Sequence, residues 1–154
     1  MSIDYDALMA AIAEKLGEVS DGRVVTRSYR DFAHRLDSDL QAGIYTVLPG
    51  GVREYPHERS DHEEASGQTA MPVFAFRIIG QGVLEEAAEG DAIDAAEFAM
   101  VAELEAFADA VISDDTQDQY EELCRIRLLG WDQSSQLEAP YYWVAARFEL
   151  GNML

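Results

Sequence analysis

The sequence has little cysteine, little basic charge and no long apolar run. Its single cysteine excludes an internal disulfide, so folding does not depend on an oxidising compartment, and we expect Cys124 to be a small core residue. No uninterrupted apolar stretch approaches the ~20 residues that span a bilayer. The acidic N-terminus lacks the basic and apolar regions of a signal peptide. These absences predict a cytoplasmic protein without a membrane segment.

Basic residues are scarce: 11 Lys and Arg stand against 30 Asp and Glu, for a net charge of −19. Binding to a phosphate backbone needs clustered Lys and Arg, so this balance argues against sequence-specific nucleic-acid binding. The arginines of the first third are also interleaved with acids, and no aromatic stacking motif accompanies them. A halophilic source is an alternative origin of the acidity.

The charges are polarised along the chain. Between Arg77 and Arg125 there are fourteen Asp and Glu residues and no Lys or Arg, whereas an upstream stretch holds Arg23, Arg27, Arg30, Arg35, Arg53 and Arg59. Opposite charges of this kind can pair across an interface. Each exposed pair contributes only ~0–1 kcal/mol, so such pairs orient a contact more than they hold it. The pattern favours an assembly protein whose partner is another copy of the chain.

The first half predicts a helix over about Asp4–Leu16, with Asp4 as N-cap and Gly17 as its stop. A short extended segment over residues 23–27 and a short helix or irregular connection over residues 29–40 follow. Ile44–Leu48 is rich in β-formers and ends at the breaker Pro49-Gly50-Gly51, after which residues 52–55 could continue a hairpin. A long polar loop then leads to residue 69.

The second half predicts a central strand over Met71–Gln81, apolar on both faces. A long helix over about Ala92–Ile112 follows, capped by Asp91, with a buried stripe widened by Phe98 and Val101. Strands over residues 123–131 and 141–150 should pair as an antiparallel hairpin.

These elements predict one α+β domain over residues 1–154, with a single, mainly antiparallel sheet and the two main helices packed on one face. The other face would then carry three arginines and two aromatic residues. That surface is too aromatic to be left to water, which makes it a candidate contact area. Its residues are Arg125, Arg127, Arg147, Tyr141 and Trp143.

Residues 57–64, which include two histidines, are the strongest candidate for a metal-binding site in the sequence. Imidazole and carboxylate groups can bind a divalent cation. His57 and His62 lie five residues apart, however, so they do not share a helical face, and the metalloprotease arrangement His-Glu-x-x-His is absent. We expect a solvated loop there and no metal site.

Other catalytic patterns are incomplete. Ser60 has no Gly-x-Ser-x-Gly elbow, and the Gly-x-Gly-x-x-Gly phosphate loop that Gly80 and Gly82 could begin is not finished. Glu85 and Glu86 are adjacent, but adjacency means little in so acidic a chain. We therefore expect no enzyme, no catalytic residue and no cofactor.

Four local segments form a recognisable combination: a strand running into a glycine turn (residues 43–51), a strand leading into an acidic turn (76–82), the opening of the long helix (95–100) and an aromatic final hairpin. Together they resemble the tail-terminator, or tail-completion, proteins of long-tailed bacteriophages and prophages. The resemblance implies a structural α+β subunit that forms a ring, typically hexameric, on the tail tube and docks to head–neck proteins. Its setting would be the virion tail, and the host cytoplasm during assembly.

A ring needs a heterologous interface, in which one patch meets a different patch on the next copy. Opposed acidic and arginine-rich segments could provide the two patches. The candidate interface residues are Arg53, Tyr55, Arg59, Glu85, Glu86, Arg125, Arg127, Tyr141, Trp143 and Arg147.

Two alternatives belong to other functional classes. An acidic inhibitor or immunity-type protein that binds a basic partner, or mimics DNA, accounts for the charge equally well. A small metal-dependent enzyme built around His57 and His62 is the second alternative.

Overall fold

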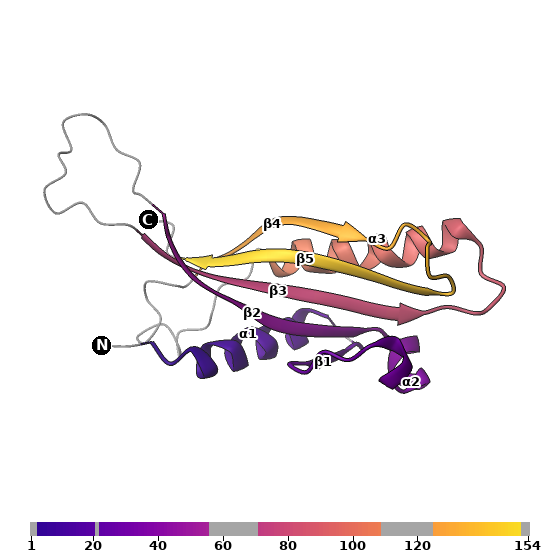
Figure 1. Ribbon diagram of the computed structural model, residues 1–154, viewed down its shortest axis with the longest axis horizontal. Helices are drawn as coiled ribbons and strands as arrows, with labels where there is room; N and C mark the ends of the chain where they lie inside the picture. Colours follow the sequence, from indigo (N-terminus) through magenta and orange to yellow (C-terminus); the bar gives the residue numbers. More distant parts are fainter. Residues whose placement is uncertain (1–2, 21, 56–70, 109–124, 152–154) are drawn as a thin grey trace, which may run out of the picture.

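The computed structural model describes residues 3–20, 22–55, 71–108 and 125–151, which form a five-stranded sheet with helices (Figure 1). The strand order is β1-β2-β3-β5-β4, so β3 is central as predicted. Only β1 and β2 pair in parallel; the other pairs are antiparallel. The strands are β1 (Val24–Thr26), β2 (Ile44–Tyr55), β3 (Met71–Val83), β4 (Arg125–Gln133) and β5 (Tyr141–Gly151).

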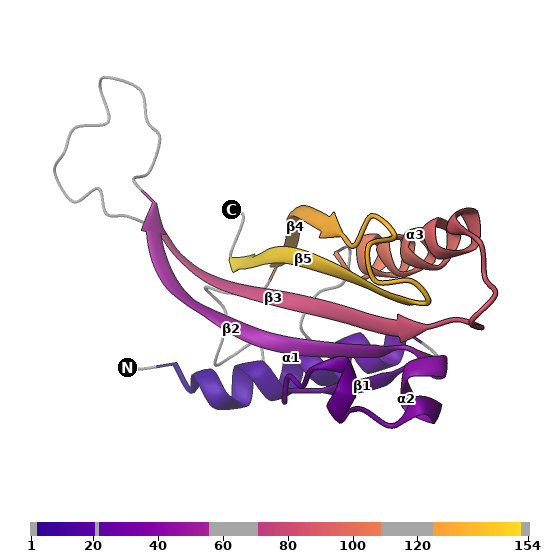
Figure 2. The ribbon, with the colours of Figure 1, turned by 45° about the vertical axis from the view of Figure 1, so that its right-hand side comes forward.

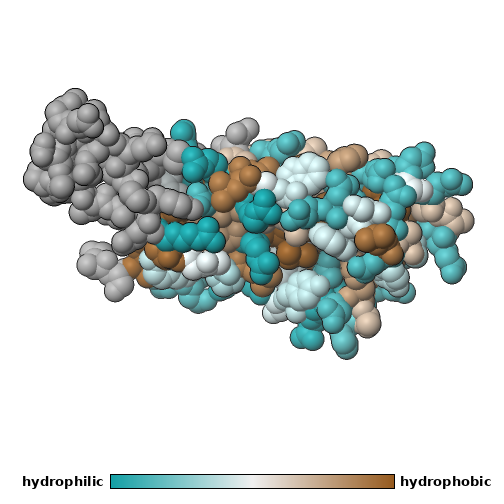
Figure 3. Space-filling model, turned by 45° about the horizontal axis from the view of Figure 1, so that its top comes forward, coloured by the Kyte–Doolittle hydropathy of each residue, from teal (hydrophilic) through white to brown (hydrophobic). Residues whose placement is uncertain are grey.

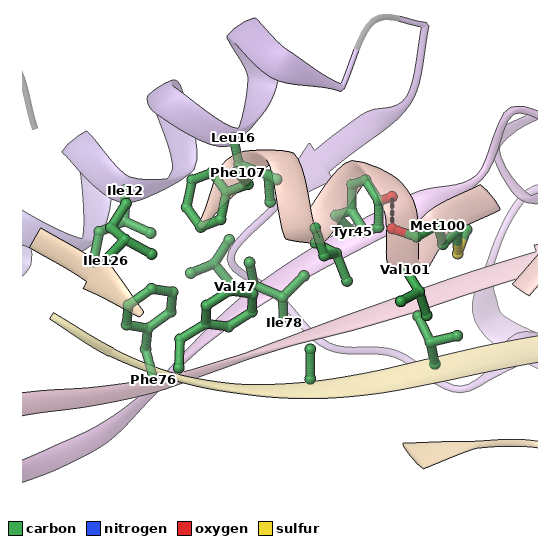
Figure 4. Packing of buried hydrophobic residues seen from close by; sticks show 14 of the residues in the cluster. Ile12, Leu16, Tyr45, Val47, Phe76, Ile78, Met100, Val101, Phe107 and Ile126 are labelled. Atoms are coloured by element: carbon green, nitrogen blue, oxygen red, sulfur yellow. Dashed lines mark hydrogen bonds between the residues drawn. The ribbon is translucent and has the colours of Figure 1, made fainter. Parts of the chain in front are cut away.

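Two long helices, α1 (Tyr5–Val19) and α3 (Gly90–Phe107), cover the same face of this sheet, and a short α2 (Asp37–Ala42) precedes β2. Alternate residues of β2 and β3 point toward the two helices (Figure 4), and alternate residues of β5 belong to the same core. The predicted α+β fold, with a mainly antiparallel sheet and both main helices on one face, is confirmed. The helices bury mainly Leu8, Met9, Ile12, Leu16, Ile93, Met100, Leu104 and Phe107.

Aromatic rings form the centre of the core. Phe76 of β3 stacks on Phe148 of β5 with ring centroids 5.1 Å apart, and Phe107 of α3 meets both rings edge-on, at 6.4 and 5.6 Å. Gly80 lets α3 approach the sheet beside them, because a Cβ atom there would lie 2.6 Å from the sulfur of Met100. The missing side chain at Gly80 thus leaves room for the side chains of Met100, Val144 and Tyr45.

β2 does not end at the predicted breaker. The ladder with β3 shifts register between Pro49 and Val52 and then resumes, so the prolyl-glycyl sequence forms a bulge. Beyond Phe74, whose partner on β5 is Leu150, β2 and β3 continue alone. Figure 2 shows this two-stranded arm, residues 52–55 and 71–73, curving past the end of β5.

The helix ends differ from the predicted ones. Asp4 is the N-cap of α1 and accepts a 3.0 Å hydrogen bond from the amide of Ala7, as predicted, but the helix continues through Gly17. The N-cap of α3 is Glu89, not Asp91. The predicted end of that helix at residue 112 and Cys124 lie outside the described residues.

The predicted buried stripe of α3 was wrong at one position. Phe98 is 48% exposed, and the neighbouring Glu97 is fully buried instead. The carboxylate of Glu97 accepts hydrogen bonds from Gln133 at 2.9 Å and from the backbone and hydroxyl of Ser134. A bulge between Leu128 and Gly130 also changes the phase of β4 and turns Trp131 toward α3.

Replacing Phe76 by alanine should lower the free energy of unfolding by about 3–5 kcal/mol, because the change leaves a cavity among three aromatic rings. Phe98→Ala is the matched control, and its cost should not exceed about 1 kcal/mol, since its ring is half in water. Chemical denaturation of both variants checks this. A Phe76→Ala cost as small as that of the control would contradict the assigned core.

Candidate functional site

The face of the sheet opposite α1 and α3, here called the helix-free face, carries the other set of alternating side chains. On β3 these are Arg77, Ile79 and Gln81, and on β5 they include Trp143 and Arg147. No described α-helix packs over its middle, and the 3-10 helix Phe32–His34 lies against one part of it. This exposed sheet surface is where a partner has most room to bind.

One end of the helix-free face is covered by residues 28–36, which connect β1 to α2. The guanidinium of Arg35 donates hydrogen bonds to the hydroxyl of Thr46 at 3.0 Å and to the amide oxygen of Gln81 at 3.4 Å. Gln81 in turn donates to the carbonyl of Arg30 at 3.0 Å, and the ring of Phe32 lies 5.0 Å from that of Tyr141. Burial lowers the pKa of Arg35, with the nearby charge of Arg30 adding to the effect. These contacts fix the segment on the sheet.

A groove of about 580 Å³ lies between this segment and the sheet. Its volume is within the ~300–1,000 Å³ typical of binding pockets. The sheet contributes apolar surface and one guanidinium, while the covering segment contributes two aromatic rings and a carboxylate. The groove is lined by Tyr29, Asp31, Phe32, Ala33, Leu48, Arg77, Ile79, Gln81, Glu138, Trp143 and Ala145.

Two arginines stand directly opposite each other beside the groove. Arg77 of β3 and Arg147 of β5 are cross-strand partners, a placement that is unfavourable for like charges. Arg147 contacts the carboxylate of Asp132 at 3.1 Å, but both side chains are more than half exposed, so the pair is weak. Within the described part of the chain Arg77 has no ion pair. An anionic group from outside the chain would relieve this repulsion.

Five of the ten predicted interface residues lie on the helix-free face: Arg125, Arg127, Arg147, Tyr141 and Trp143. Arg127 lies 3.3 Å from the buried carboxylate of Glu149. Tyr141 and Trp143 are only partly exposed. The structure therefore brings together the residues that were predicted from strand alternation.

The other predicted residues lie apart from this face. Arg53 is exposed on the two-stranded arm, and the backbone of Tyr55 pairs with Met71 at its tip. Glu85 and Glu86 are exposed in the turn after β3, at the opposite end of that strand. Arg59 lies outside the described residues.

The groove was not predicted from the sequence, because the contact of residues 28–36 with the sheet was not predicted. Tyr29 and Phe32 were predicted to lie in a short helix or an irregular connection, with no contact to the sheet assigned. Arg77 and Ile79 could have been found, because their alternation in β3 places them on the same face as Trp143. The long-range bonds of Arg35 have no local signature in the sequence.

The arginine-rich first third is partly used within the molecule. Arg23 forms a two-pronged ion pair with Glu103 of α3, with nitrogen–oxygen distances of 2.7 and 2.8 Å, and Tyr45 donates to the same carboxylate at 2.8 Å. Arg27 contacts the exposed carboxylate of Asp6 at 2.9 Å. Arg23 therefore holds α3 to the sheet, while the exposed pair of Arg27 is weak. Four other arginines, Arg77, Arg125, Arg127 and Arg147, lie on the helix-free face.

The contacts among Arg23, Tyr45 and Glu103 shift the pKa values of all three side chains. Burial alone would raise the pKa of Glu103, but hydrogen bonds from Arg23 and Tyr45 outweigh burial and hold that pKa below its usual value. Burial, assisted by the bond to Glu103, raises the pKa of Tyr45. The bond to Glu103 likewise raises the pKa of Arg23. Glu103 is therefore a carboxylate at neutral pH.

In the described ranges no three His, Cys, Asp or Glu side chains gather in a way that could hold a metal ion, while His57 and His62 lie outside those ranges. None of the helices described is both long enough and apolar enough to cross a membrane. No protein-family model matches the chain, and no curated protein matches its sequence.

Glu103→Gln should lower the free energy of unfolding by about 1–3 kcal/mol near neutral pH, because it removes the charge from a carboxylate that accepts charge-assisted hydrogen bonds. The native pKa of Glu103 is depressed, so its contribution is present above the pKa of the unfolded chain. It is lost as pH falls through the lower native value.

Denaturation of both proteins between pH 7 and pH 2 measures the effect, with Glu18→Gln as the control because its pair with Lys15 is exposed. A difference between wild type and Glu103→Gln that stays constant over this range would contradict the assigned role.

Proposed function

We propose that this chain is a structural subunit of a long phage or prophage tail, a tail terminator that forms a ring on the tail tube and docks to head–neck proteins. The support from sequence is the resemblance of residues 43–51, 76–82 and 95–100, together with the final hairpin, to that family. The α+β fold agrees with this resemblance.

The observation that carries the proposal is an exposed arginine of the helix-free face, Arg77, which has no ion pair within the described residues. Arg77 is exposed opposite Arg147 in a chain whose net charge is −19. A ring subunit needs two unlike patches. An unpaired arginine on an acidic molecule gives a carboxylate of a second copy a place to bind.

The molecular surface supports association through mixed rather than purely apolar contacts. The side shown in Figure 3 is a mosaic, in which small hydrophobic areas lie between hydrophilic side chains. Interfaces of this composition gain specificity from charge complementarity and affinity from a few buried anchors. Trp143, half-buried in the groove, has the properties of such an anchor.

A second candidate function is the acidic inhibitor. In its favour, Arg23 and Arg27 form ion pairs within the chain. Two positive charges of the arginine-rich first third are therefore not free to bind an acidic neighbouring copy. An inhibitor would act as a monomer and would bind a basic partner through its acidic surface.

Light scattering and negative-stain imaging of the purified protein, alone and with tail-tube subunits, separate the two. A tail terminator should form closed rings, six-membered by the family resemblance, that cap tube ends and stop tube growth. A monomer that ignores tail tubes and binds a basic nuclease tightly would overturn the proposal in favour of the inhibitor.

Association between copies should weaken as salt rises, because the Debye length shortens to ~3 Å near 1 M. Sedimentation velocity from 0.05 to 1 M NaCl measures this as a shift toward smaller species. Association that is unchanged or stronger in high salt would mean that apolar packing, and not the arginine-bearing face, holds the copies together.

A further inference from the structure

The groove on the helix-free face has different chemistry at its two ends. Arg77 of β3 is the cross-strand neighbour of Leu48, whereas Gln81, further along β3, stands opposite Trp143 of β5, and all four residues line the groove. A strand rises about 3.3 Å per residue, so about 13 Å of β3 separates Arg77 from Gln81. A ligand that fills the groove therefore meets two distinct environments.

The end near Trp143 is acidic and aromatic. Glu138 lies in the loop before β5, and its carbonyl accepts a 2.9 Å hydrogen bond from the amide of Tyr141, the first residue of that strand. The ring of Phe32 lies 5.0 Å from that of Tyr141, which brings Asp31, the next residue along, to the same end. We call Asp31, Phe32, Glu138 and Trp143 the acidic end of the groove.

The two carboxylates of the acidic end are not neutralised within the described chain. Asp31 is the N-cap of the 3-10 helix Phe32–His34, yet its side chain accepts no capping hydrogen bond. Neither Asp31 nor Glu138 has an ion pair in the part of the chain that the structure describes. The faces of aromatic rings attract ammonium and guanidinium groups, most strongly at tryptophan. Carboxylates beside such rings favour a cation.

The opposite end of the groove favours an anion. Arg77 is exposed, stands opposite Arg147 and has no ion pair among the described residues. A guanidinium binds a carboxylate through two parallel charge-assisted hydrogen bonds. A carboxylate bound at Arg77 would also relieve the repulsion between the two facing arginines.

The surface between the two ends is apolar. Ile79 and Ala145 are cross-strand partners, both half-buried, and they lie between Arg77 and Trp143 along the groove. Covering apolar surface contributes about 25 cal/mol per Å². A hydrocarbon chain suits this part of the groove, whereas a ligand with adjacent charges cannot reach both ends.

We propose that the groove binds a zwitterion whose amine and carboxylate stand at opposite ends of an apolar chain, with the amine at the acidic end and the carboxylate on Arg77. A purely cationic ligand would leave Arg77 unpaired. A purely anionic ligand would be repelled by the acidic end and by the net charge of −19. The chemical class is an ω-amino acid, and a lysine at the C-terminus of a protein presents the same two groups.

This ligand site goes beyond the proposed function, because it does not depend on the chain being a tail subunit. Titration of dilute protein, in which no second copy covers the groove, tests it by NMR of the two indole N–H groups. Trp143 reports on the groove, and Trp131, which packs against Phe98 beside α3, is an internal control.

The probes are glycine, 6-aminohexanoate, 8-aminooctanoate, hexylamine and hexanoate. The two long amino acids should shift the Trp143 signal and leave Trp131 unchanged. Glycine should not bind, because its charges are adjacent. Hexylamine and hexanoate, each with one charge, should bind at least tenfold more weakly than 6-aminohexanoate.

Two variants assign the ends. Arg77→Gln and Glu138→Gln should each weaken binding of 6-aminohexanoate at least fivefold. Only Glu138→Gln should also weaken hexylamine, because the amine does not need Arg77, and a merely structural effect would not separate the two probes. Arg53→Gln and Glu14→Gln, at exposed positions outside the groove, are matched controls and should bind as wild type does. Thermal melts establish that each variant is folded.

Peptides distinguish the two sources of the ligand. A peptide that ends in lysine with a free carboxylate should bind, and its C-terminal amide should not, if a protein C-terminus is the ligand. Binding of 6-aminohexanoate but of neither peptide would assign the site to a free ω-amino acid. Both results support the zwitterion.

Two results would overturn the proposal. Hexylamine that binds as tightly as 6-aminohexanoate would exclude a zwitterion, and a Trp143 signal that responds to no probe would exclude the site. Either result would leave the proposed function as it stands. A wild-type protein that is monomeric at all concentrations and on tail tubes would overturn that function alone.

Discussion

The structure depends on both main helices burying their apolar stripes against the same face of one sheet. Because α1 and α3 share a core with Phe76 and Phe148, that face is filled. The alternation of side chains along β3 and β5 then places every second residue on the opposite face, where no long helix covers it. The asymmetry of the fold is therefore also the origin of its candidate binding surface.

The arginines have different roles on the two faces of the sheet. Arg23 is used to hold α3 to the sheet, through a carboxylate that also accepts a bond from Tyr45. Arg35 holds the covering segment on the other face. The arginines of β3 and β5, in contrast, stand opposite each other without comparable compensation. The surplus acidity of the chain disfavours association in general, so we propose that the exposed arginines of this face select which contact forms.

Much of the fold could be predicted from sequence, because its signals are local and periodic. Alternation in residues 71–81 and 141–150 predicted two of the three inner strands and the face of each of their residues, and Asp4 marked the start of α1. The errors arose where tertiary contacts override local preference. Pro49-Gly50-Gly51 is a breaker in isolation, yet pairing with β3 continues across it. Phe98 is apolar, yet buried Glu97 has its hydrogen-bond partners at the end of β4.

The candidate site was predictable only in part, for the same reason. Arg147 and Trp143 followed from strand alternation, whereas the groove depends on Arg35, whose bonds to Thr46 and Gln81 join residues up to 46 positions apart. The arginine-rich segment was correctly seen as unusual, but its composition could not show which arginines pair within the fold. Composition reports the charge of a segment, and geometry decides where that charge is available.

The most direct test of the central claim is hydroxyl-radical footprinting of Trp143 as a function of protein concentration. We expect Trp143 to be labelled in dilute monomer and protected as assemblies form, while Tyr5, exposed on α1, is labelled equally throughout. Labelling of Trp143 that is the same in monomer and assembly would show that the helix-free face is not the contact between copies.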